Sequence, residues 1–224
     1  MTRSQINSLM REASGFFARM SFRLPPWAAW GPGQWKGMGE RAREIVENML
    51  GWDLTDFGGG RFQQKGLLLF TIRNGNLKAG AGGKPYAEKI MIVGENQETP
   101  MHFHWKKMED IINRGGGNLV IELHGSTPEE GLSREPIGVS IDGISHRLEA
   151  GARVVLTPGE SICLLPRLYH RFHGQGGRVL VGEVSSVNDD TTDNRFYEPQ
   201  GRFPEIEEDE EPLHLLVTDY PRYL

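Results

Sequence analysis

From Trp52 onwards the sequence is divided into short apolar runs separated by turn-forming residues. The chain has 29 glycines and 13 prolines, and in its second half these recur about every eight to twelve residues. This spacing is typical of a mainly β architecture, either a small barrel or a sandwich. The expected strands are residues 66–73, 87–93, 100–106, 118–124, 138–141, 147–156, 161–165, 178–184 and 213–217.

Glycine-containing pairs mark the turns expected between these strands. Asn74-Gly75, Asp142-Gly143, Pro158-Gly159 and Gly176-Gly177 each contain a residue that tolerates positive φ. The triplet Gly115 to Gly117 predicts a hairpin turn, because it lacks the strand-to-helix context of a phosphate-binding loop.

The first 51 residues follow a helical period instead. Apolar residues spaced three or four apart from Ser4 to Met20 predict an amphipathic helix with Ser4 as its N-cap. A second helix is expected from Met38 to Leu50, ended by Gly51. We therefore expect a single domain over residues 1–224, with a helical extension at 1–51 packed outside a β-barrel at 52–224.

Charge and composition exclude several classes of protein. Twenty-five basic and 30 acidic residues give a net charge of −5, so the chain lacks the basic footprint of a nucleic-acid-binding protein. No apolar run approaches the roughly 18 residues that a membrane-spanning helix needs. The first residues lack the apolar segment of a secretory signal, and Cys163, the only cysteine, has no partner for an internal disulfide. These features predict a cytoplasmic protein without nucleic-acid or membrane partners.

The stretch from Pro100 to Glu109 carries a metal-binding pattern. Residues two apart in a strand point to the same side, so His102 and His104 can direct their imidazoles at one point. Glu109 follows a short turn, and His170 lies where a partner strand would supply a fourth ligand. Three imidazoles and a carboxylate suit a divalent manganese, iron, cobalt, nickel or zinc ion, and the absence of thiolates argues against structural zinc. The alternative is that these are ordinary strand histidines.

These residues also resemble the motifs of the cupin superfamily. The pattern His102-x-His104-x4-Glu109-x6-Gly116 matches the first cupin motif except at its leading glycine, where this chain has Asn96. The second motif is met at Gly159 and His170 with the correct spacing. Its Pro, Gly and Asn positions are occupied by Leu165, Arg167 and Gly174.

Longer strings resemble a narrower group, the bacterial D-lyxose ketol-isomerase family. The resemblance covers nearly the whole chain and implies a cupin-type β-barrel (jelly roll), commonly a homodimer. It also implies a manganese-type divalent ion and interconversion of D-lyxose with D-xylulose and of D-mannose with D-fructose. By this resemblance the metal ligands are His102, His104, Glu109 and His170, and Lys107 belongs to the active site. The matched strings are residues 86–91, 99–105, 109–119, 158–164 and 182–190.

An aldose–ketose isomerisation moves a proton between adjacent carbons, so an acid and a base are needed besides the metal. Lys107 lies between two predicted metal ligands, and Lys89 occupies the inward phase of the strand at 87–93. Glu183 lies in an apolar strand, where a buried carboxylate requires a partner. These three residues are the candidate acid and base groups. For Glu183, a structural salt bridge to Arg114 or Arg195 is the alternative.

Four further residues are candidates for substrate contacts. Trp105 and Phe172 are expected to form an apolar wall, and Asp190 and Arg195 to bind sugar hydroxyls. Two other functions fit the same motifs. A cupin dioxygenase can use three histidines and a glutamate to hold iron, and a sugar-binding cupin can keep the barrel without turnover.

Overall fold

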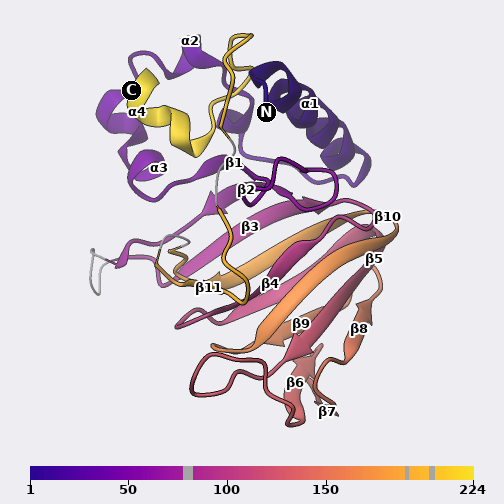
Figure 1. Ribbon diagram of the computed structural model, residues 1–224. Coiled ribbons are helices and arrows are strands. Elements are labelled where there is room, and N and C mark those ends of the chain that lie inside the picture. The colour runs from indigo at the N-terminus through magenta and orange to yellow at the C-terminus, as the bar shows by residue number, and fades with distance from the viewer. Residues whose placement is uncertain (78–82, 190–191, 202–204) are drawn as a thin grey trace.

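The computed structural model describes residues 1–77, 83–189, 192–201 and 205–224. Their strands form one antiparallel sheet that curves around an interior, and the helices gather on one side of it (Figure 1). The strands are β1 (Gly51–Thr55), β2 (Leu67–Arg73), β3 (Tyr86–Val93), β4 (Thr99–His104), β5 (Glu109–His124), β6 (Ile137–Ile141), β7 (Ile144–Leu148), β8 (Arg153–Leu156), β9 (Ser161–Leu164), β10 (Tyr169–Ser186) and β11 (Asn194–Phe196).

The long strand β10 organises the sheet, because it pairs with β3, β4 and β5. His170 lies opposite His102 of β4, and Glu183 lies opposite Lys89 of β3. His170 and Glu183 both line the interior although thirteen positions separate them, an odd number that would place them on opposite faces of a regular strand. A shift in register between Gln175 and Val179 changes the phase and turns both side chains inward.

The helices cover the outer face of β1, β2 and β3. Helix α1 (Arg3–Arg19) buries apolar residues such as Ile6 and Phe17 against Trp52 and Phe70 of the sheet. The C-terminal segment packs into the same layer, where Tyr220 joins a second apolar cluster (Figure 1). The other helices are η1 (Pro26–Ala29), α2 (Pro32–Trp35), η2 (Gly39–Ala42), α3 (Arg43–Glu47), η4 (Val217–Asp219) and α4 (Tyr220–Tyr223).

At the N-terminus, two details of the helix prediction are wrong. Thr2, not Ser4, caps α1: its side chain accepts from the backbone of Gln5, while the Ser4 hydroxyl donates to Asp209. The helix expected at 38–50 is instead the 3₁₀ turn η2 followed by α3, which ends at Glu47. Among the described residues, no helix is long and apolar enough to span a membrane.

Two strand predictions are also wrong, and one strand was not predicted. Residues 213–217 form no strand, because Leu215 and Val217 pack beside Trp35 in the helical layer. The run at 147–156 is split between β7 and β8 by a turn in which the Ala152 amide donates to the Glu149 carbonyl. Strand β1 was not expected at all.

The triplet Gly115 to Gly117 is not a hairpin turn but an irregular stretch within β5. Gly116 has a φ of +95°, and a Cβ there would lie 2.2 Å from the Arg178 carbonyl oxygen. Glycine is therefore required because β5 and β10 approach closely where their register shifts.

Candidate active site and metal centre

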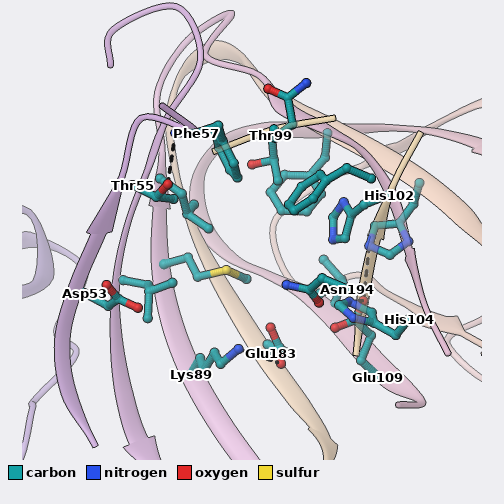
Figure 2. A pocket seen from close by; sticks show the side chains of 18 of the residues that line it. Asp53, Thr55, Phe57, Lys89, Thr99, His102, His104, Glu109, Glu183 and Asn194 are labelled. Atoms are coloured by element: carbon teal, nitrogen blue, oxygen red, sulfur yellow. Dashed lines mark hydrogen bonds and ion pairs between the residues drawn. The ribbon is translucent and has the colours of Figure 1, made fainter. Parts of the chain in front are cut away.

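The interior of the barrel holds a cavity of about 360 Å³. Figure 2 shows His102, His104 and Glu109 on one side of this cavity, with Asp53 and Thr55 of β1 on the opposite side. Strands β2, β3, β5, β10 and β11 supply most of the remaining walls, and the connecting segments complete them with Phe57, Lys107, Gln200 and Gly201. The cavity is therefore bounded by imidazoles at one end and by the strands under the helical layer at the other.

Three buried histidines converge at the first end. His102 and His104 come from β4, where alternation places both on the inner face, and His170 comes from β10. One ring nitrogen of each lies within 4.8 Å of the others. The structure thus brings together the three histidines that the sequence analysis proposed as ligands.

Backbone carbonyls orient each of these rings. The Nδ1 atoms of His102, His104 and His170 lie 2.8, 3.3 and 3.0 Å from the carbonyl oxygens of Pro100, Asp193 and Leu168. A carbonyl only accepts, so each Nδ1 donates to it and each Nε2 atom is left to face the centre of the cluster. Burial lowers the pKa of His102 well below its ordinary value, and the neighbouring His170 and His104 lower it further. These effects favour the neutral form of the His102 imidazole.

Glu109, the first residue of β5, faces the same point. Its Oε1 atom lies 3.3 Å from His104 Nε2 and 3.2 Å from His170 Nε2, and it has no hydrogen-bond partner among the described residues. Burial would raise the pKa of Glu109, but the Lys107 ammonium, 2.7 Å from Oε2, and His104 hold it well below its usual range. A buried carboxylate oxygen beside converging imidazole nitrogens is a donor set that fits a divalent cation.

Two lysines and a second carboxylate lie beside this centre. The Lys107 ammonium bridges Glu109 and Glu183, with its Nζ atom 2.9 Å from Glu183 Oε1. Lys89 lies beside Glu183 (Figure 2), with its Nζ atom 3.6 Å from the same Glu183 oxygen. The Ser185 hydroxyl also donates to this oxygen. All four charged side chains are buried. A connected path of groups that can exchange protons therefore runs from the metal-binding cluster along the cavity wall.

The family model for D-lyxose isomerase matches residues 1–220 of this chain. The chain belongs to the D-lyxose isomerase family. Two curated relatives carry the name D-lyxose/D-mannose isomerase. That of Serratia proteamaculans is 49% identical over 231 residues, and that of Escherichia coli O157:H7 is 48% identical over 226 residues. Both alignments cover 100% of this chain and of the relative. The protein is therefore an enzyme, a sugar isomerase.

Solved structures support the fold of this D-lyxose isomerase family member. The L-ribose isomerase of Cellulomonas parahominis has a TM-score of 0.59 at 15% identity, covering 92% of this chain and 98% of that one. The L-ribose isomerase of Geodermatophilus obscurus gives 0.56 at 16% identity with the same coverage. The prediction of a mainly β, cupin-type barrel with N-terminal helices packed outside is confirmed.

The predicted substrate contacts of this family member differ in whether they line the cavity. Phe172 lines the cavity, whereas Trp105 and Arg195 do not. Trp105 follows the outward phase of β4 and packs against Phe103, because the inward phase is taken by the histidines. Arg195 points outward from β11, where it pairs with Glu130 and not with Glu183. Asp190 lies outside the described residues.

Several cavity residues of this family member were missed by the sequence analysis. Asp53 and Thr55 belong to the unexpected strand β1. Thr99 and Asn194 lie on β4 and β11, and their Oγ1 and Oδ1 atoms are buried without a hydrogen-bond partner among the described residues. In a regular strand, Thr99 would lie on the face opposite His102. The irregular pairing of β4 with β10 near Phe172 instead places Thr99 at the cavity. Unpaired buried oxygens on a cavity wall are suited to bind substrate hydroxyls.

Proposed function

We propose that this protein is a metal-dependent aldose–ketose isomerase that interconverts D-lyxose with D-xylulose and D-mannose with D-fructose. The family and the names of both curated relatives support these substrates. A buried cavity of about 360 Å³ with lysine, carboxylate and hydroxyl groups on its walls suits a free monosaccharide.

The metal ligands in this proposal are His102, His104, Glu109 and His170, and the ion is Mn²⁺. The observation that carries the proposal is the convergence of three buried histidines on the buried Glu109 carboxylate, whose Oε1 atom lies 3.3 Å from His104 Nε2 and 3.2 Å from His170 Nε2. Nitrogen and oxygen donors without a thiolate accommodate Mn²⁺. When bound, the ion would stabilise the negative charge that develops on the two reacting sugar oxygens.

Proton transfer falls to the buried side chains next to these ligands. Glu183 takes the proton from C2 of the aldose and returns it to C1, so the carboxylate ends the cycle as it began. Lys107 donates a proton to O1, which becomes a hydroxyl, and recovers one from O2, which becomes the ketone oxygen. Lys89 holds the Glu183 carboxylate from its other side, at 3.6 Å. Phe172 contributes an apolar part of the cavity wall.

We further propose that residues 1–224 act as one domain, with a homodimer as the assembly and the cytoplasm as the location. The family resemblance supports the homodimer. The single cysteine, Cys163, supports a location where disulfides are not needed.

The test is ketose formation from D-lyxose and D-mannose by EDTA-treated protein, before and after addition of Mn²⁺. We expect no activity in the stripped protein and recovery with Mn²⁺. Full activity of EDTA-treated protein that contains no metal would contradict the metal role. Failure to form ketose by folded, Mn²⁺-bound protein would contradict the isomerase proposal, and oxygen uptake with ferrous iron would then favour a dioxygenase.

A further inference from the structure

We propose that Asp193 is a positioning residue that holds both the proton-transfer lysine Lys107 and the metal ligand His104 in place. Asp193 lies just before β11 and is 9% exposed. It does not line the cavity, so its role is exerted through the chain segment that it contacts. The inference rests on the proposed isomerase function, in which Lys107 transfers protons and His104 binds the ion.

The side chain of Asp193 binds two consecutive backbone amides. Its Oδ1 atom accepts from the Lys106 amide and its Oδ2 atom from the Lys107 amide, both at 2.9 Å. These amides lie in the turn that connects β4 to β5, and hence His104 to Glu109. A carboxylate is the side chain that offers an acceptor to each amide, and its charge strengthens both hydrogen bonds.

The backbone carbonyl of Asp193 contacts the two residues that precede Lys106, namely His104 and Trp105. It lies 3.3 Å from His104 Nδ1 and accepts from the Trp105 amide at the same distance. One residue therefore contacts four consecutive positions, from the ring of a metal ligand to the backbone of the lysine. Strand β11 continues this contact, because Asn194 pairs with His104 (Figure 2).

The position of this turn determines where the Lys107 ammonium lies. Its Nζ atom is placed between two buried carboxylates, at 2.7 Å from Glu109 and 2.9 Å from Glu183. Contacts this short are lost when the backbone that carries the lysine moves by about 1 Å, and displacements of that size can lower a rate by about 100-fold. The same movement would release the His104 ring, because the Asp193 carbonyl sets its orientation.

The substitution Asp193→Asn tests this role because it preserves shape while removing one acceptor. The new Nδ2 group would face an amide N–H, so one of the two hydrogen bonds is replaced by a repulsive contact between donors. Asp56 provides a matched control: it is buried, and its two carboxylate oxygens accept from the Gly58 and Gly60 amides at 2.9 and 3.1 Å. Asp56→Asn therefore makes the same chemical change in a loop that holds no metal ligand or proton-transfer group.

For Asp193→Asn with saturating Mn²⁺, we expect kcat on D-lyxose to fall about 10- to 100-fold, with KM within about threefold of wild type. Without sugar, the Mn²⁺ dissociation constant, followed by the electron paramagnetic resonance of free Mn²⁺, should rise about 3- to 10-fold. In a Lys107→Met background, Asp193→Asn should lower kcat by less than about threefold relative to Lys107→Met alone, because both substitutions act through the Lys107 side chain. Asp56→Asn should leave kcat and the Mn²⁺ dissociation constant within about twofold of wild type.

The inference is overturned if Asp193→Asn lowers thermal stability without changing kcat or the Mn²⁺ dissociation constant, or if its effect on kcat is undiminished in the Lys107→Met background. If Asp193→Asn does not fold, Asp193→Ser keeps one acceptor and should show the same pattern to a smaller extent. A wild-type protein that forms no ketose would contradict the proposed function instead. In that case the Mn²⁺ dissociation constants of wild type and Asp193→Asn would still test the contact between Asp193 and His104.

Discussion

Replacing Arg3 by methionine tests how the two ends of the chain stabilise the helical layer. The Arg3 side chain is fully buried and donates four hydrogen bonds, two to Glu208 and two to Asp219, at 2.8 to 3.0 Å. It thereby joins α1 to the C-terminal segment. Methionine approximates the volume of the apolar stem but leaves Asp219, which is 7% exposed, without its cationic partner.

The expected loss follows from the burial of the two acids. Removing one partner of a buried ion pair costs about 3 to 5 kcal/mol. Glu208 is 35% exposed and can return to water, while Asp219 keeps a hydrogen bond from the Leu216 amide, so the lower end applies. For a chain of this size, a loss of about 3 kcal/mol lowers Tm by about 6 to 12 °C.

Thermal unfolding followed by circular dichroism, at equal Mn²⁺ concentration, measures this loss. The control is Arg43→Met, because Arg43 and its partner Glu40 are 65% and 87% exposed and such pairs contribute about 0 to 1 kcal/mol. The Arg3 contacts lower the pKa of Glu208, so the part of the stabilisation that Glu208 contributes is complete above its unfolded value, about pH 4.3, and is lost as the pH falls. A Tm for Arg3→Met equal to that of Arg43→Met would refute the reasoning.

Three predictions concern the cavity. Glu183→Gln should lower kcat about 100- to 10,000-fold with Mn²⁺ still bound, whereas Glu122→Gln, whose carboxylate pairs with Arg171 outside the cavity, should stay within about threefold. Full activity of the Glu183 variant in a ketose assay would exclude it as the base. Thr99→Val should raise KM for D-lyxose about 2- to 10-fold without loss of Tm, because the hydroxyl has no partner among the described residues. An unchanged KM would place the substrate elsewhere. His102→Ala should retain less Mn²⁺ after dialysis, and a wild-type metal content by elemental analysis would contradict its role as a ligand.

The parts of the site that follow a local period were predictable from the sequence. Two-residue alternation is a property of any strand, so His102 and His104 had to face the same side wherever β4 lay. Helix α1 follows equally from its apolar spacing, although its cap is Thr2. Glu109 and His170 were proposed from their residue types and their places in the expected strand order, and similarity to a known family supported them, because no local period connects either residue to β4.

Other parts depend on contacts between distant segments. Strand β1 was missed because it is short and its cavity-facing residues, Asp53 and Thr55, are polar, so it lacks an apolar inner phase. Trp105 and Arg195 were predicted to contact the substrate, but neither lines the cavity. A sequence shows which residues of a strand share a face, but it does not show which face borders the cavity. Only pairing with a neighbouring strand determines which phase faces inward.

The sequence by itself therefore determined which side chains share a face, where helices replace strands and which ligand types are present, because these are properties of neighbouring residues. The tertiary structure alone decided that Glu183 pairs with Lys89 and Lys107 and that a register shift in β10 turns His170 and Glu183 to the same cavity. It also decided that Asp193 holds the turn carrying Lys107. These outcomes depend on register and on contacts between segments up to 94 positions apart, the separation of Lys89 and Glu183, which no short-range pattern encodes.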